Sequence, residues 1–449
     1  MLNKIKDSLT NSDDIKSSII RINNIDLLIV YSKDLANIEE FNKYYINTLR
    51  ANIDNDLTNY FPTLINLIDY NIETFKKSIL NGFILLIKTN IAYEFLLPKP
   101  NARSITNSII DPVDLYSAQD GFIENMDINI SLIRKHLRDE NLMVEIITLP
   151  NKCHNRIAII NLNKHNQNNQ IIKDKLNTIK EDNINSINSI SKIFQKNHFV
   201  PVTLSTSSPQ NVSLSITKGK TIILLDNSPV ACIIPVNFLY FSTMKTDIDT
   251  PKYYSILSRS LVILFMFISV FLLGLYVAIT NFHSSSLTIY ALSNLKLTER
   301  GTTLPMLSEI LIVLLLFDLY RYATSRSSNG YIQNIIIFLG GLFIGQNAIK
   351  SGLIGHLVLL ITSISYLATY AFTNNLHMVT SLSIFRIIIL IFSYLFGLFG
   401  FIVSSIFILY YLLSIKTFDT DFFLSLKPNK FRKNINYFIP KEESNEKNP

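Results

Sequence analysis

The sequence has few of the residues that form disulfide-linked or metal-bound scaffolds. Its 449 residues include only two cysteines, Cys153 and Cys232, and no tryptophan. The two cysteines have no metal-ligand spacing, so we expect each to be a small buried hydrophobe and not part of a disulfide or zinc site. The N-terminal segment lacks an apolar signal core. This predicts that the region before the first membrane segment stays in the cytosol.

Motifs of the common enzyme classes are also missing. The sequence has no Gly-rich phosphate loop, no His-Glu-x-x-His zinc site and no nucleophile elbow. Its seven histidines are scattered along the chain, and His136 is expected to be a surface residue and not a general base. We therefore expect no catalytic residues, no metal and no cofactor.

The net charge of +7 is compatible with nucleic-acid binding, but the basic residues do not interleave with aromatic residues on one face. Many of them instead flank apolar segments, as Lys427, Lys430, Arg432 and Lys433 do. This pattern is typical of membrane topology. We therefore expect contact with lipid and not with nucleic acid.

Long apolar runs are confined to the second half of the chain. They cover residues 261–279, 304–320, 331–349, 353–372 and 387–415. A helix of about 19 residues rises about 28 Å, which is enough to cross a bilayer core. The last run is too long for one simple span, and we expect Gly397 and Gly400 to kink it or to host a tight turn.

The flanking charges predict how these segments are oriented. Lys252 and Arg259 precede the first segment, and the tail after Lys416 is strongly basic, so both ends are expected inside. Both ends inside requires an even number of crossings. We expect four crossings, with one segment re-entrant or interfacial, and six is the alternative.

Polar residues in the apolar half are candidates for function, because unpaired charge in hydrocarbon is costly. Asp318 and Arg321 are spaced i, i+3 and can pair with each other, as a local ion pair near the cytosolic end of a helix. Glu309 lies deeper. It is expected either to face the protein interior or to line a water-filled path.

A second group of candidates lies in the stretch GLFIGQNAIKSGLIGH, residues 341–356. Its candidate residues are Gly341, Gly345, Gln346, Asn347, Lys350 and Gly352. The glycines permit close helix contact or a sharp break, and the two amides can satisfy backbone groups that a break would free. One interpretation is a tight helical hairpin with Lys350 at the interface, and the other is the lining of a pore or gate.

The first half of the chain alternates predicted strands and helices. Strands are expected at 25–32, 82–89, 143–150, 156–162 and 221–227, with an amphipathic helix after Asp120 and a polar helical region over 164–195. We therefore expect an α/β cytosolic N-terminal domain with two subdomains, followed by an α-helical polytopic membrane domain. The expected boundaries are 1–110, 111–250, 251–415 and a basic cytosolic tail at 416–449.

Five segments together resemble the GerA family of bacterial spore germination proteins. SAQDGFIENMDINISLIRKHLRDENLMVE resembles the family's signature turn and helix. The others follow in family order: KGKTIILLDNSPVACIIPVNFLYF, LGLYVAITNFHSSSL, ERGTTLPMLSEILIVLLLFDLYRYA and GLFIGQNAIKSGLI. The signature-helix residues that the resemblance singles out are Asp120, Gly121, Phe122, Arg134 and Arg138.

The resemblance implies a subunit that works without catalysis. The family's A-type subunit sits in the inner spore membrane with a transporter-like B subunit and a lipoprotein C subunit. Such subunits are thought to form homo-oligomeric channels that release monovalent cations when nutrients bind. The resemblance therefore implies an A subunit of a germinant receptor. The alternatives are an auxiliary channel protein of the same family and a non-conducting membrane scaffold.

Overall fold

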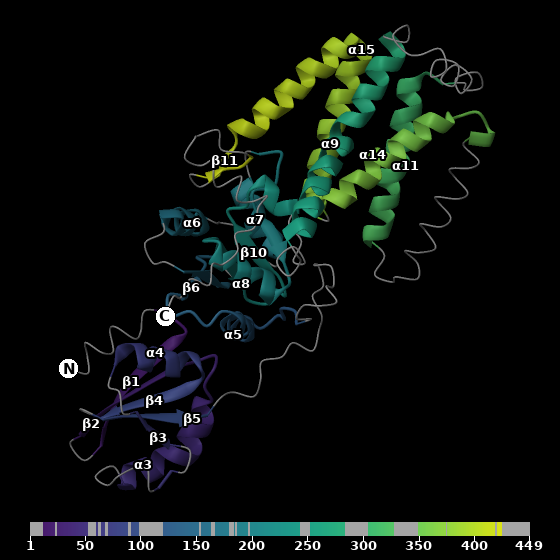
Figure 1. Ribbon diagram of the computed structural model, residues 1–449. Helices are drawn as coiled ribbons and strands as arrows, with labels where there is room; N and C mark the ends of the chain where they lie inside the picture. Colours follow the sequence, from purple (N-terminus) through teal and green to yellow (C-terminus); the bar gives the residue numbers. More distant parts are fainter. Residues whose placement is uncertain are drawn as a thin grey trace. The chain divides into compact units, whose positions relative to one another are not determined.

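The structure is a computed structural model in which the chain divides into two compact units (Figure 1). The first unit contains residues 1–197 and 202–236, and the second contains 198–201 and 237–449. The structure describes residues 12–22, 25–52, 60–61, 64–67, 71–88, 91–97, 120–151, 154–162, 167–178, 184, 186–195, 198–242, 252–282, 304–326, 349–373, 375–417 and 420–423.

The first sheet of the N-terminal unit has five strands in the order β1-β2-β4-β5-β3. These strands are β1 (Ile15–Ile22), β2 (Ile25–Ser32), β3 (Leu64–Leu67), β4 (Phe83–Lys88) and β5 (Ile91–Leu96). Neighbouring strands in this sheet pair antiparallel. Side chains alternate along a strand, so Leu27 and Ile29 point to one face of the sheet while Leu28 and Val30 point to the other.

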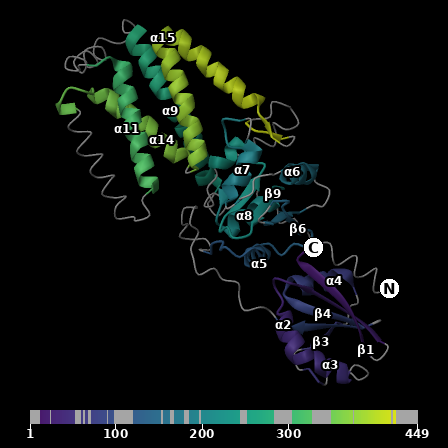
Figure 2. The same ribbon diagram turned by 180° about the vertical axis from the view of Figure 1, so that it is seen from behind.

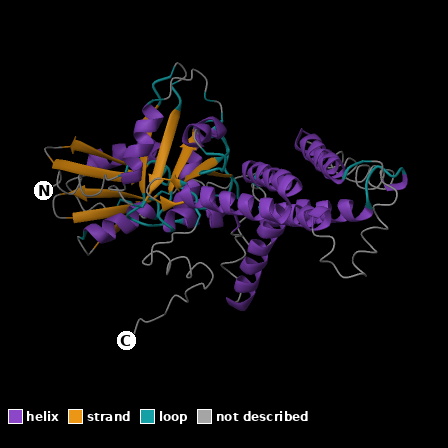
Figure 3. Ribbon diagram, turned by 90° about the horizontal axis from the view of Figure 1, so that it is seen from above, coloured by secondary structure: helices purple, strands orange, loops and turns teal. Residues whose placement is uncertain are grey.

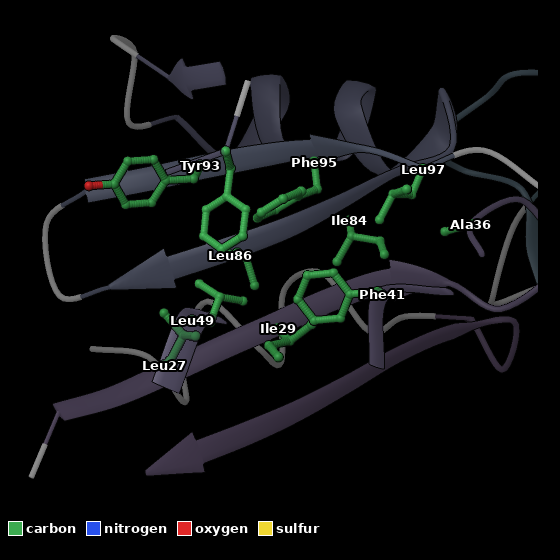
Figure 4. Packing of buried hydrophobic residues seen from close by; sticks show 11 residues of the cluster. Leu27, Ile29, Ala36, Phe41, Leu49, Ile84, Leu86, Tyr93, Phe95 and Leu97 are labelled. Carbon is green, nitrogen blue, oxygen red and sulfur yellow. The ribbon is translucent and has the colours of Figure 1, made fainter. Parts of the chain in front are cut away.

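Helices bury both faces of this sheet. One face packs against Phe41 and Leu49 from the helical stretch α2 (Ile38–Glu40), η1 (Phe41–Tyr45) and α3 (Ile46–Asn52). In Figure 4, Phe41 and Phe95 lie within this core, and their ring centroids are 5.4 Å apart. The other face packs against Phe75 and Ile79 of α4 (Ile72–Leu80).

The second sheet also has five strands, in the order β6-β7-β9-β10-β8. These are β6 (Met143–Thr148), β7 (Arg156–Asn161), β8 (Leu204–Thr206), β9 (Thr221–Leu225) and β10 (Ala231–Ile234). All five residues of β9 are buried, as expected for a central strand that is covered on both faces. The helices of this part are α5 (Met126–His136), α6 (Gln167–Asn177), α7 (Ile187–Gln195) and α8 (Pro209–Thr217).

The predicted fold class is confirmed: a sheet-containing N-terminal region precedes a helical C-terminal region. The five predicted strands correspond to β2, β4, β6, β7 and β9. The predicted polar helical region over 164–195 forms α6 and α7, and α7 buries an apolar face. The predicted boundary between residues 110 and 111 lies outside the described residues and stays a prediction, as do the other predicted boundaries.

The helical unit contains four long helices, coloured purple in Figure 3, among its described residues. They are α9 (Lys252–Phe282), α11 (Met306–Arg326), α14 (His356–Phe372) and α15 (Leu376–Ser414). A shared apolar core joins them through Leu273, Val313, Val358 and Leu390. Within the described part of the chain, two helical stretches, Ile256–Phe282 and Leu376–Ser414, are long and apolar enough to cross a membrane. The predicted segment 331–349 falls almost wholly outside the described residues.

Helix α15 consists of two arms that diverge at Gly397 (Figures 1 and 2). Gly397 has φ +63° and ψ −141°, a conformation that side-chain-bearing residues rarely adopt. A Cβ at Gly400 would overlap the carbonyl oxygen of Phe392. The predicted break in the last apolar run is therefore confirmed, and glycine is required there for both conformation and space.

Candidate functional site

The signature helix α5 begins with side-chain capping. Its N-cap residue Asn125 accepts hydrogen bonds from the backbone N–H groups of Asp127 and Ile128, at 3.0 and 3.2 Å. Asn129 folds back on the preceding turn, where it donates to the carbonyl of Ile123 and accepts from the N–H of the same residue. These bonds fix the turn to the helix that follows it.

Arg134 on α5 forms a buried ion pair with Asp14, which lies just before β1. Its Nε and Nη2 donate to the two carboxylate oxygens of Asp14 at 2.8 and 2.9 Å. Nη2 also donates to the carbonyl of Leu142, and the Arg134 side chain is 1% exposed. Because Asp14 precedes the first sheet and Leu142 precedes β6, this guanidinium joins the two sheets of the N-terminal unit.

Further polar contacts connect α5 to the first sheet. The hydroxyl of Ser131 donates to the carbonyl of Asp34 at 2.9 Å, and Lys33 pairs with Asp127 at 3.0 Å. Burial alone would raise the pKa of Asp127, but Lys33 and Arg156 outweigh it and lower that pKa. The charged form of Asp127 is therefore the one held at this junction.

The other signature residues have distinct surroundings. The Asp120 carboxylate lies 2.9 Å from Nε2 of His136, and this hydrogen bond lowers the pKa of Asp120 against the opposing effect of burial. Gly121 is buried, and the N–H of buried Phe122 donates to the carbonyl of Ser207. His136 was expected at the surface, but its side chain is only 20% exposed because Asp120 holds it.

Arg138 lies just beyond the C-terminus of α5. It donates to the side-chain oxygen of Asn81 at 3.3 Å, and this bond is exposed to solvent. The contact of Arg138 therefore lies at the solvent-exposed edge of the region where α5 meets the first sheet, while Arg134 is buried inside that region.

Glu309 of α11 lies in the interior of the helical unit. The residue is 3% exposed, and its Oε2 accepts a hydrogen bond of 3.0 Å from the N–H of Gly355. Gly355 is the N-cap of α14 and has no side chain with which to cap the helix itself. The Glu309 carboxylate satisfies this donor at the positive end of the helix dipole.

The GLFIGQNAIKSGLIGH candidates are described only in part. Gly341, Gly345, Gln346 and Asn347 lie outside the described residues. Lys350 is exposed, and Gly352 has φ +69°, which lies in the left-handed region. The hairpin and pore interpretations of this stretch both stay predictions.

Asp318 and Arg321 of α11 pair at 3.2 Å. The hydroxyl of Tyr366 on α14 lies 3.3 Å from the carboxylate of Asp318 and 3.0 Å from the carbonyl of Phe317. Both oxygens are within hydrogen-bond distance of this single donor. Arg321 also donates to the hydroxyl of Thr380 on α15 at 3.2 Å. The ion pair therefore ties α11 to both α14 and α15.

Arg386 of α15 lies beside these residues, although the sequence analysis did not single it out. We call Asp318, Arg321, Tyr366, Thr369 and Arg386 together the polar cluster. It is 1% exposed, its Nη2 donates to the hydroxyl of Thr369 at 2.9 Å, and its guanidinium lies 5.5 Å from the ring centre of Tyr366. The predicted apolar segment began at residue 387 and so left out the charge just before it. A lone arginine inside the stretch LSIFRIIILIF was the available signal.

The polar cluster continues through α14 to α9. The hydroxyl of Thr369 bonds to the carbonyl of Ser365, and the hydroxyl of Ser365 donates to the carbonyl of Ser269 on α9 at 2.9 Å. Chemically, this arrangement offers charge and hydroxyl groups inside an apolar bundle. Among the described residues, no group of three or more His, Cys, Asp or Glu side chains is placed to hold a metal ion.

Comparison with known proteins shows to which family the chain belongs. A sequence model of the Bacillus/Clostridium GerA spore germination proteins matches residues 3–448. The chain belongs to the GerA family. That match includes the signature helix, the polar cluster and the glycine-rich stretch together.

Several GerA-family proteins are similar to most of this chain. Spore germination protein XA of Bacillus anthracis is 28% identical over 80% of this chain and 75% of its own length. Spore germination protein GerQA of Bacillus cereus is 25% identical over 96% of this chain and 86% of its own. An uncharacterized membrane protein of Bacillus subtilis, YfkQ, is 22% identical over 88% of this chain and 75% of its own.

One solved structure also resembles the chain. It is the crystal structure of the N-terminal domain of the A subunit of the Bacillus megaterium spore germinant receptor GerK3. It is 16% identical, has a TM-score of 0.38, and covers 53% of this chain and 94% of its own.

Proposed function

We propose that this chain is the A subunit of a spore germinant receptor. In this proposal it spans the inner spore membrane with its N-terminal unit and its tail in the cytoplasm. It assembles into a homo-oligomeric channel that releases monovalent cations when nutrients bind. A transporter-like B subunit and a lipoprotein C subunit complete the receptor, and the chain itself carries no catalytic site.

The polar cluster of the helical unit is the observation that carries the channel proposal. Asp318 and Arg321 lie on α11, which also carries Glu309, and Arg386 lies on α15. Among the described helices, stretches of α9 and α15 have the length and composition of membrane spans. Ionisable residues in membrane helices are costly and face a bundle interior or a water-filled cavity, where they mark ion pathways. The family match, which covers nearly the whole chain, supports a role in germination.

Potassium release from spores tests this proposal. Spores of a deletion strain that carries this gene are compared with spores of the deletion strain alone, before and after nutrient addition. Prompt release that depends on both nutrient and gene is expected. Normal early release without the gene would contradict the receptor proposal.

The glycine-rich stretch provides a sharper test of the channel. Replacing Gln346 and Asn347 with leucine removes two amides from an apolar segment without shortening it. If these amides line the ion path, potassium release is lost while the protein still reaches the membrane and assembles. Detection of the assembled variant on a blot of spore membranes is the control, and unchanged release would refute the pore assignment.

An auxiliary channel protein of the same family is the second candidate. The similarity to YfkQ is consistent with it, since the name of that relative says only that it is a membrane protein. In the potassium experiment an auxiliary protein leaves early nutrient-dependent release normal and slows later germination. A non-conducting scaffold would also spare early release, but it would produce no ion flux when reconstituted in vesicles.

A further inference from the structure

The buried guanidinium of Arg386 is only partly satisfied by its neighbours. Nη2 donates to Thr369, but no acceptor for Nε or Nη1 is present among the described residues, and both atoms are buried. A buried donor without an acceptor is destabilising, and more so when the group is charged. Such donors call for an acceptor that the described residues do not supply.

Among the described residues, no carboxylate forms an ion pair with Arg386. On the described helices of this unit the carboxylates are those of Glu309 and Asp318. Glu309 is bound at the N-terminus of α14, and Asp318 already pairs with Arg321. Counted over the described residues, the cluster therefore has an excess of one positive charge. Arg386, which carries it, is 1% exposed, and an unpaired ion in such a place is strongly unfavourable.

Two serines on the same helix have unused hydroxyl groups as well. Ser383 lies three residues before Arg386 and Ser393 lies seven residues after it, and the Oγ of each is buried without a partner among the described residues. At these spacings both lie on or beside the helix face that carries Arg386. Each hydroxyl has one O–H group that can donate to an anion, although more weakly than a charged guanidinium.

We propose that Arg386 binds a small monovalent anion, either a carboxylate or a halide. One negative charge balances the excess of one positive charge in the cluster. A small ion suits a site between packed helices, and the guanidinium matches the geometry of a carboxylate well. Tyr366 contacts both groups, because its ring lies beside the guanidinium and its hydroxyl donates to Asp318.

Equilibrium dialysis of the purified full-length chain in detergent, with radiolabelled acetate and with radiolabelled chloride, tests this site. One saturable site per chain is expected. In Arg386→Gln, which removes the charge and the two free donors, binding should weaken roughly tenfold or more. Lys416→Gln is the matched control, because it removes an exposed cation from the same unit and should leave binding unchanged.

The two anions distinguish the possible ligands. Saturable binding of acetate that chloride does not displace identifies a carboxylate site, and mutual displacement identifies a site for small anions in general. No saturable binding of either anion by the wild-type chain would overturn the proposal, even if Arg386→Gln failed to fold. Equal binding by wild type and a folded Arg386→Gln would overturn it too. The assay measures no ion flux, so its result is independent of the proposed channel function.

Discussion

Arg134 and Arg138 show how different two nearby arginines of one signature segment can be. Arg134 is buried and holds both oxygens of Asp14, while the bond of Arg138 to Asn81 is exposed. Removing one partner of a buried ion pair leaves the other charge uncompensated, at a cost of about 3–5 kcal/mol. We expect Arg134→Ala to lower the free energy of unfolding by that amount, and Arg138→Ala by no more than about 0.5 kcal/mol.

Urea unfolding of the purified chain, followed by circular dichroism, measures both losses. A double replacement, Asp14→Leu with Arg134→Met, should recover most of the stability, because it removes both charges and leaves apolar groups in their place. An Arg134→Ala protein as stable as the Arg138→Ala protein would show that the buried pair does not hold the two sheets together.

Cys232 provides a test of burial at a single residue. Burial raises the pKa of its thiol to about 11, against the opposing effect of a hydrogen bond with Ser191. The thiolate is the reactive form, so below that pKa the thiol is neutral and shielded. In a Cys153→Ser background, iodoacetamide at about pH 8 should leave the native chain unlabelled and should label one thiol after unfolding in urea. Rapid labelling of the native chain would contradict the buried position.

At the scale of elements, the break in α15 involves two glycines, and Gly397 is the one with a positive φ. At Gly397 a Cβ would meet Cγ of Phe282 at 2.8 Å, in addition to the strain of its positive φ. Gly219 also has a positive φ, +74°, but a Cβ placed there would have no atom within 4 Å, so this position reports backbone strain alone. We expect strain of roughly 1–3 kcal/mol for alanine at either position, and a further loss at Gly397 from crowding.

Thermal unfolding in detergent compares the two alanine variants. Adding Phe282→Ala to Gly397→Ala should recover the part of the loss that comes from crowding, but not the part that comes from φ. If Gly397→Ala is no less stable than Gly219→Ala, the two arms of α15 do not need this glycine.

The elements that the sequence predicted are those with strong local patterns. The five predicted strands are apolar runs, and β9 is buried along its whole length. Strand β1 was missed because its sequence, IKSSIIRI, mixes exposed and buried positions and its partner is β2 alone in the sheet order. Local patterns could not predict the strand directions either, since these depend on which strands pair. Arg386 was missed because hydropathy places a charge at the end of an apolar run, whereas packing places this one inside the bundle.

At the scale of the whole molecule, the units are not continuous in sequence. Residues 198–201 belong to the helical unit, where the N–H of Phe199 donates to the hydroxyl of Tyr411 and its carbonyl accepts from the hydroxyl of Ser381. Ser381 and Tyr411 lie on opposite arms of α15, so this short segment bridges the arms. Such an insertion depends on contacts between distant residues, which local sequence patterns do not show, and the predicted boundary at 250/251 stays a prediction.

The orientation of the chain is a prediction at the same scale. Lys252 and Arg259 precede the apolar part of α9, and the tail carries Lys427, Lys430, Arg432 and Lys433. Because basic residues favour the cytoplasmic side, both ends of the chain should lie inside, which requires an even number of crossings. Epitope tags at the two termini, probed with protease on sealed vesicles of known orientation, measure this directly. Both tags should be cleaved in inside-out vesicles and protected in right-side-out vesicles, and tags on opposite faces would require an odd number of crossings.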